Sequence, residues 1–169
     1  MAVSETTAAP PNWVSFAQTA PYLRKATLAA AQEKVAALPA QTLARTQSLL
    51  QTLTGMCGEP GNLHKAGALL KTALPDLAPK NHESSGPHPH VAAASLAVDA
   101  VLHGLVFCLG QKVKNSRNPE SAALDLLRAM KDLPISDGVA RATLHIEARE
   151  AMGAALYLKL VEAHPELAH

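Results

Sequence analysis

Residues 91–110 read VAAASLAVDAVLHGLVFCLG, and this stretch decides the fold. It is almost wholly apolar and long enough to cross a membrane, but Asp99 and His103 lie near its middle. Two ionisable side chains are costly at the centre of a bilayer and are better tolerated in a protein core that supplies partners for them. We therefore predict that residues 90–113 form the apolar central helix of a helical bundle, with no membrane span.

The flanking sequence predicts further helices on both sides of this one. Prolines fall at the borders of the periodic segments, as expected for a residue that lacks the N–H group and clashes with the preceding helical turn. Apolar residues inside the segments recur at helical spacing, and no stretch shows the period of two that is typical of strands. The predicted fold class is all-α, an irregular bundle of about six helices over residues 21–38, 39–55, 62–74, 90–113, 118–132 and 137–163.

The chain length of 169 residues favours a single domain. Residues 1–12 lack both the basic and the apolar regions of a secretory signal, so we expect a flexible tail there and one helical domain over residues 13–169. Residues 75–89 hold four prolines, and this composition predicts the longest loop of the domain.

Charge and cysteine content restrict the expected partners and compartment. Lys and Arg number 15 against 14 Asp and Glu, so the chain lacks the positive excess typical of nucleic-acid binding. Cys57 and Cys108 lie 51 positions apart and form no CxxC pair, which predicts two buried free thiols in a reducing compartment. We therefore expect a cytoplasmic protein that does not bind nucleic acid.

The common catalytic motifs are absent from the sequence. It contains no phosphate-binding Gly-rich loop, no GxSxG, no HExxH and no CxxC. We therefore predict a protein that is not an enzyme, with no catalytic residues and no cofactor.

Asp99 and His103 form the strongest candidate site. They lie one helical turn apart on the same face of an otherwise apolar helix. A carboxylate beside an imidazole can orient it as a base or a metal ligand, but it can also be a buried pair that only satisfies its own hydrogen bonds. His145, Glu147 and Glu150 could join this pair if the last helix packs against the central one, although the two Glu-x-x-His motifs of di-metal bundles are missing.

Three histidines of the Pro-rich loop, His82, His88 and His90, form a second candidate metal site. Two imidazoles two residues apart can share a metal ion, but zinc takes three or four ligands, and no nearby cysteine or acidic cluster supplies the others. Solvated loop histidines are the simpler interpretation. The metal hypothesis therefore groups Asp99 and His103 with His88 and His90.

Aromatic residues are concentrated near the N-terminus. Trp13, Phe16 and Tyr22 fall within ten residues of one another and could form an exposed anchor for a protein partner. Such a cluster can equally attach a terminal segment to the core.

Three short segments resemble the YjaG-like family of small bacterial helical proteins. They are LARTQSLLQTLTG at 43–55, ALPD at 73–76 and AVDAVLHGL at 97–105, with a loop between the last two. The resemblance implies an all-helical, bacterial, cytosolic protein, and it places Asp99 and Ala100 in the most recognisable helix of that family. It implies no activity.

These observations lead to three hypotheses on function. The first is a non-enzymatic protein-binding module, most concretely a bacterial immunity or antitoxin-like inhibitor of a partner toxin or effector. The second is a metal- or small-ligand-binding helical protein centred on Asp99 and His103. The third is a homodimeric scaffolding protein.

Overall fold

The structure, a computed structural model, describes residues 12–79, 88–135 and 137–168. The predicted all-α class is confirmed over these residues, where helices occur and strands do not. The α-helices are α1 (Asn12–Ala17), α2 (Lys25–Ala36), α3 (Ala40–Thr54), α4 (Asn62–Ala73), α5 (Pro89–Lys114), α6 (Pro119–Lys131), α7 (Gly138–Met152) and α8 (Ala154–Ala163). Two short 3₁₀ helices, η2 (Pro75–Leu77) and η3 (Pro165–Ala168), follow α4 and α8. His82 and most of the predicted tail lie outside the described residues.

The described residues contain eight α-helices where the sequence predicts about six. One addition is α1, a six-residue helix that precedes the first predicted helix, which begins at residue 21. The other arises because the predicted helix over residues 137–163 is broken at Gly153. Gly153 has a φ of +99°, a conformation open to glycine and strained for other residues, and it separates α7 from α8.

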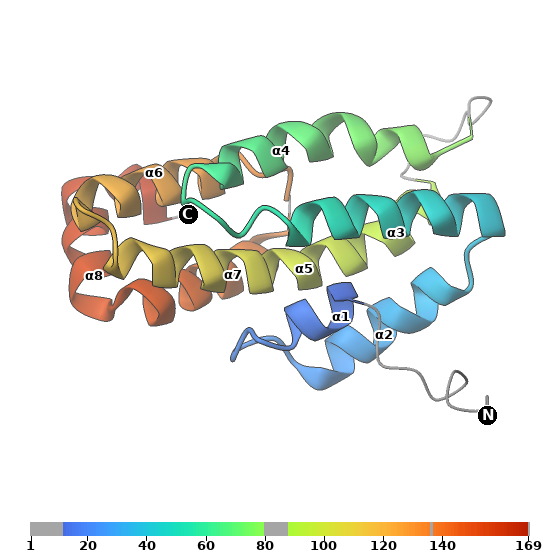
Figure 1. Ribbon diagram of the computed structural model, residues 1–169, viewed down its shortest axis with the longest axis horizontal. Coiled ribbons are helices and arrows are strands. Elements are labelled where there is room, and N and C mark those ends of the chain that lie inside the picture. Colours follow the sequence, from blue (N-terminus) through green and yellow to red (C-terminus); the bar gives the residue numbers. More distant parts are fainter. Residues whose placement is uncertain (1–11, 80–87, 136, 169) are drawn as a thin grey trace.

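Helix α5 packs against helices from both halves of the chain. It contacts α1, α2 and α3 as well as α6 and α7. Figure 1 shows α1 and α2 along one side of the molecule and α4 along the opposite side. Among the described residues, α5 is also the one helix long and apolar enough to cross a membrane, and 56% of its most apolar 18-residue window is buried inside the molecule.

Two glycines in α5 allow neighbouring helices to approach closely. A Cβ atom added at Gly104 would lie 2.6 Å from the carbonyl oxygen of Phe16 in α1. One added at Gly110 would lie 2.6 Å from the Cβ of Ala151 in α7. Both distances are shorter than any ordinary contact, so each glycine is required by the packing on its side of α5.

Replacing Gly104 by alanine is expected to lower the free energy of unfolding by about 1–2 kcal/mol, measured by urea denaturation. Overpacking against a backbone carbonyl costs about 1–3 kcal/mol, which exceeds the gain of about 1 kcal/mol from removing a helical glycine. Gly67 in α4 is a matched control, because a Cβ there meets its nearest neighbour at 3.6 Å, an ordinary contact. Gly67→Ala should therefore stabilise the protein, and a loss at Gly67 as large as at Gly104 would contradict the packing argument.

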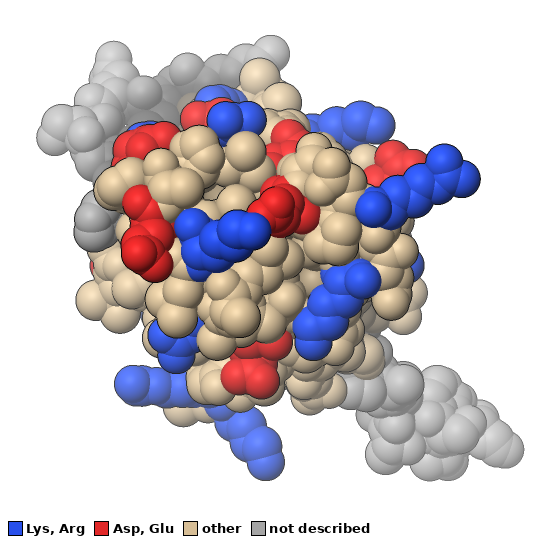
Figure 2. Space-filling view, turned by 90° about the vertical axis from the view of Figure 1, so that its left-hand side faces the viewer, with Lys and Arg blue, Asp and Glu red and all other residues tan. Residues whose placement is uncertain are grey.

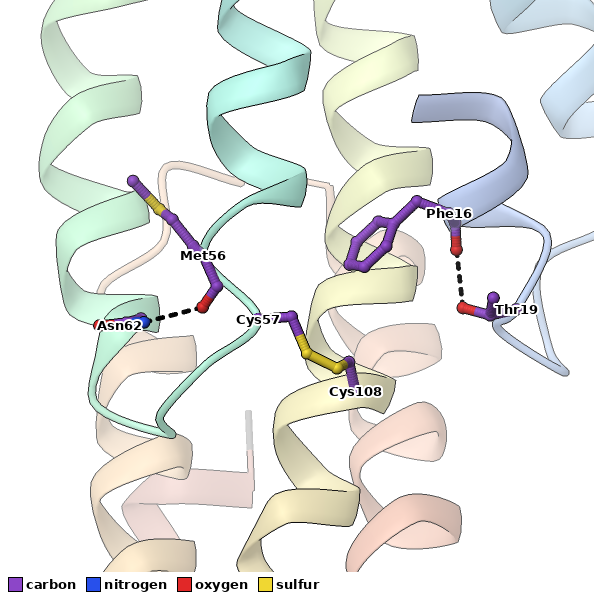
Figure 3. The surroundings of a disulfide bond; sticks show 6 residues. All are labelled: Phe16, Thr19, Met56, Cys57, Asn62 and Cys108. Atoms are coloured by element: carbon purple, nitrogen blue, oxygen red, sulfur yellow. Dashed lines mark hydrogen bonds between the residues drawn. A yellow bond between two sulfur atoms is a disulfide. The ribbon is translucent and has the colours of Figure 1, made fainter. Parts of the chain in front are cut away.

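Cys57 and Cys108 form a disulfide, so the prediction of two free thiols is wrong. Cys57 lies in the turn that leads from α3 to α4, and Cys108 lies in α5 (Figure 3). Contact between α3 and α5 brings the two Cα atoms to 6.1 Å, a normal separation for a disulfide. The prediction of a reducing compartment rested on free thiols and has lost that basis, because disulfides persist mainly in oxidising compartments.

Charges of both signs are mixed on the end of the molecule that lies at the left of Figure 1 and faces the viewer in Figure 2. Lys159 of α8 forms an ion pair with Glu120 of α6. An exposed pair of this kind contributes little to stability. This face therefore carries no extended patch of one sign.

Candidate functional site

A buried hydrogen bond joins His103 of α5 to Glu147 of α7. The His103 Nδ1 atom lies 2.8 Å from a Glu147 carboxylate oxygen, Oε2. The His103 residue is 7% exposed and Glu147 is fully buried. Small residues at the α5–α7 contact, such as Gly110 and Ala151, let the two helices approach closely enough for these side chains to meet.

Tyr22 attaches the segment before α2 to the same part of α7. Its backbone N–H donates to Glu147 Oε2 at 3.0 Å, and its hydroxyl donates to Glu150 Oε1 at 3.0 Å. Glu147 Oε2 therefore faces two donor positions, the Tyr22 N–H and the His103 Nδ1. The other carboxylate oxygen, Oε1, is buried without a hydrogen-bond partner among the described residues.

The Asp99 carboxylate lies in a cleft beside this pair. The cleft has a volume of about 320 Å³ and lies between the segment leading into α2, one face of α5 and the beginning of α7. Its polar lining includes Asp99, His103, Arg24 and Asp137. The structure thus brings Asp99 and His103, the predicted pair, to one accessible hollow.

The Asp99 carboxylate forms no hydrogen bond or ion pair with any described residue, although it lies beside the charged and polar groups of this lining. Burial raises the pKa of its carboxyl to about 6; the nearby His103 opposes this shift and Asp137 adds to it. A carboxylate that is largely removed from water and lacks a partner is unfavourable for folding.

The Asp99→Asn variant is expected to be more stable than the wild type at pH 7.5, by up to about 3 kcal/mol. The folded-state pKa of about 6 exceeds the ordinary value of 3.8, so the folded protein holds this proton more tightly than the unfolded chain. The contribution of Asp99 to stability is therefore full below about pH 4 and is lost as the pH rises through 6. Urea denaturation should show the two proteins converging near pH 4.

A control for that comparison is Asp125→Asn. Asp125 is exposed and pairs with His64 at 2.9 Å, so its neutralisation removes a surface charge without relieving burial. A stabilisation at pH 7.5 by Asp125→Asn equal to that of Asp99→Asn, or a destabilisation by Asp99→Asn, would contradict the assignment of Asp99 as an unpartnered buried carboxylate.

The histidines of the other candidate sites do not join the cleft. His88 caps the N-terminus of α5, its Nδ1 accepting the His90 N–H at 3.0 Å. His90 lies nine residues before Asp99 on α5, which is about 14 Å along the helix. His145 lies two residues from Glu147 but contacts Tyr157 of α8 through its Nδ1 at 2.8 Å. In the part of the chain that the structure describes, no three His, Cys, Asp or Glu side chains are grouped to hold a metal ion.

The three N-terminal aromatic residues have different environments. Trp13 is 3% exposed and Phe16 packs against the core, so both attach α1 to the bundle. Tyr22 is 44% exposed and lines the cleft. Of the predicted partner-binding residues, only Tyr22 lies at an accessible surface of the candidate site.

No family model matches the sequence, and neither the curated proteins nor the solved structures contain a significant match. The resemblance to the YjaG-like family therefore remains a prediction.

Proposed function

We propose that the protein binds a small organic ligand in the cleft lined by Asp99 and His103. The observation that carries this proposal is the Asp99 carboxylate, which is largely buried, lines the cleft and has no partner among the described residues. A ligand in the cleft would supply the missing interaction. Pockets with a few convergent polar groups and a residue of perturbed pKa are the usual form of a ligand site.

The surrounding groups support a site that is held in place. Glu147, which also accepts the Tyr22 N–H, holds the Nδ1 edge of the His103 ring, so that the Nε2 edge is the one left to contact a ligand. We also propose that α5, which supplies Asp99 and His103, is the helix around which the bundle is organised, supported by its contacts with five other helices. Binding residues on such a helix are positioned more rigidly than residues on a loop.

The proposal is tested by ligand-observed NMR of a small-molecule fragment library against the wild type and two variants. Fragments that bind in the cleft should lose binding in Asp99→Asn and keep it in Asp125→Asn, the surface control. Thermal shifts of the same proteins report whether each binder stabilises the folded state, as linkage requires. Fragments that bind the wild type and Asp99→Asn equally, or a library without a single binder, would refute a ligand site at Asp99.

A second candidate function is the binding of a protein partner, as in a bacterial immunity or antitoxin-like inhibitor. The observation in its favour is that three of the exposed large apolar side chains surround the same cleft: Tyr22 (44%), Leu96 (39%) and Val139 (74%). Exposed apolar groups around a depression are common at protein interfaces. Capture of one specific partner by the wild type, abolished by Val139→Glu, would favour this function over small-ligand binding.

If a second copy of the chain packed on Tyr22, Leu96 and Val139, it would form the homodimer of the third hypothesis. Light scattering of the purified protein decides this directly, because Val139→Glu should convert such a dimer to monomer.

A further inference from the structure

Asp99 and Asp137 line two hollows at once. One is the cleft of about 320 Å³ already described. The other has a volume of about 150 Å³. Apart from Ser95 and the two carboxylates, its walls are aliphatic: Leu70, Leu74, Val98, Leu102, Pro134 and Ile135. The two hollows therefore share these two carboxylates in their lining.

The smaller hollow has the size and lining of a site for a small apolar group. An apolar cavity of about 150 Å³ is large enough to hold benzene. A group of this size would contact aliphatic side chains of α4 and α5 and the segment before α7. Its polar end would then lie beside Asp99 and Asp137.

The two carboxylates that the hollows share are hydrogen-bond acceptors. Asp99 has no partner among the described residues, and one oxygen of Asp137 accepts the Val139 N–H at 3.0 Å, which leaves the other available. The His103 Nδ1 faces the Glu147 oxygen that already accepts the Tyr22 N–H, so Nδ1 is the donor of this hydrogen bond. The Nε2 atom of His103 bonds to no described residue.

We propose that the two hollows together bind a primary amine with a small apolar body, the ammonium group lying at Asp99 and Asp137 and the apolar body in the smaller hollow. This inference rests on the ligand-binding function proposed above. An ammonium group offers three N–H donors and a positive charge, which match acceptors that include two carboxylates. An anion would be repelled by the same acids. A divalent metal lacks a group of three ligands among the described residues.

Arg24 lies in the larger cleft, where its guanidinium can contact an anionic group of a ligand. Arg24 lines that cleft and not the smaller hollow, and its guanidinium forms no ion pair or hydrogen bond with the described residues. An amine that also carries a carboxylate would therefore gain a charged contact there.

The test is isothermal titration calorimetry with benzylamine, benzyl alcohol and benzoate, three probes that share the apolar ring. We expect saturable binding of benzylamine and at least about 10-fold weaker binding of the other two, because a hydrogen bond to a charged group accounts for about a factor of 10 to 100. Asp99→Asn should lower the benzylamine affinity by a similar factor. Ser95 is half-buried and lines the smaller hollow, so Ser95→Leu should reduce the volume of that hollow while leaving the fold intact. This variant should bind benzylamine more weakly than the wild type.

The pH dependence provides an independent readout. Benzylamine affinity should fall between pH 7.5 and pH 5, because the Asp99 carboxylate has a pKa of about 6 and must be ionised to hold the ammonium. The other charged or titratable groups around it are Asp137 at the start of α7, His103 on α5, with Glu147 behind it, and Arg24 before α2. Asp99→Asn should flatten this dependence.

Each outcome decides between the inference and the function on which it rests. Binding of benzyl alcohol or benzoate, lost in Asp99→Asn, without binding of benzylamine would overturn the amine class and leave ligand binding in place. Failure of all three probes, together with a fragment library without binders, would overturn both. Tighter binding of Nα-acetyl-lysine methylamide than of benzylamine would overturn the small-molecule assignment in favour of a lysine side chain of a protein partner.

Discussion

Replacing Cys57 and Cys108 together by serine is expected to lower the free energy of unfolding by about 4 kcal/mol. The disulfide closes a loop across 51 positions of sequence, and cross-linking a loop of this length removes that amount of entropy from the unfolded chain. The bond also ties the turn after α3 to α5, where it opposes separation of these two elements (Figure 3). Urea denaturation of the wild type and the double variant, both without reductant, measures the difference.

Two controls make this result specific to the disulfide. Dithiothreitol should destabilise the wild type towards the double variant and leave the variant unchanged. A thiol titration of the unfolded, unreduced wild type should find no free thiol. Two free thiols per chain, or a wild type that is indifferent to reductant, would contradict the disulfide and restore the original prediction of a reducing compartment.

Glu147→Ala is expected to lower the free energy of unfolding by about 3–5 kcal/mol, because it leaves two buried donors unsatisfied and truncates a buried side chain. The substitution leaves the His103 Nδ1 and the Tyr22 N–H without their acceptor in a region where water does not replace it. It also opens a cavity at a fully buried position. Chemical denaturation at pH 7 measures the loss.

Glu150→Ala is the matched control on the same helix. Its carboxylate accepts a hydrogen bond from the Tyr22 hydroxyl at an exposed site, so its removal should cost about 0.5 kcal/mol or less. The double substitution His103→Leu with Glu147→Leu should be far less harmful than Glu147→Ala, because apolar residues of similar volume can replace a buried polar pair. If Glu147→Ala and Glu150→Ala lowered the free energy of unfolding equally, the buried contact with His103 would contribute no more to stability than the exposed hydrogen bond of Glu150.

Two acidic residues near His103, Glu147 and Asp99, thus have opposite expected effects on stability. Glu147 is buried with partners, and its removal should destabilise the fold. Asp99 is largely buried without one, and its neutralisation should stabilise the fold above pH 6. A residue that costs stability and lines a cleft is a candidate for function, because active and binding sites commonly retain such groups. The hydrogen bond between His103 and Glu147, taken alone, needs no explanation beyond the stability of the fold.

The sequence indicates part of the candidate site. The spacing of Asp99 and His103 on one apolar helix singles out these two residues, and His145, Glu147 and Glu150 are the residues expected to join them if the last helix packs against α5. Only Glu147 does, because the side chains of residues 145 and 147 point to different neighbours, α8 and α5. Tyr22 was singled out for its aromatic ring, whereas its backbone N–H makes the contact with Glu147. No sequence pattern marks a backbone donor of this kind.

The sequence by itself determined the helical class, most helix borders and the burial of residues on α5, because proline positions and apolar spacing act locally along the chain. Only the tertiary structure decided that Cys57 bonds to Cys108, that Glu147 meets His103, and that Asp99 and Asp137 line the same two hollows. These arrangements bring together residues 38 to 51 positions apart, and they depend on which helix faces pack together. Helical periodicity defines the faces of each helix, but it carries no information on how those faces are paired.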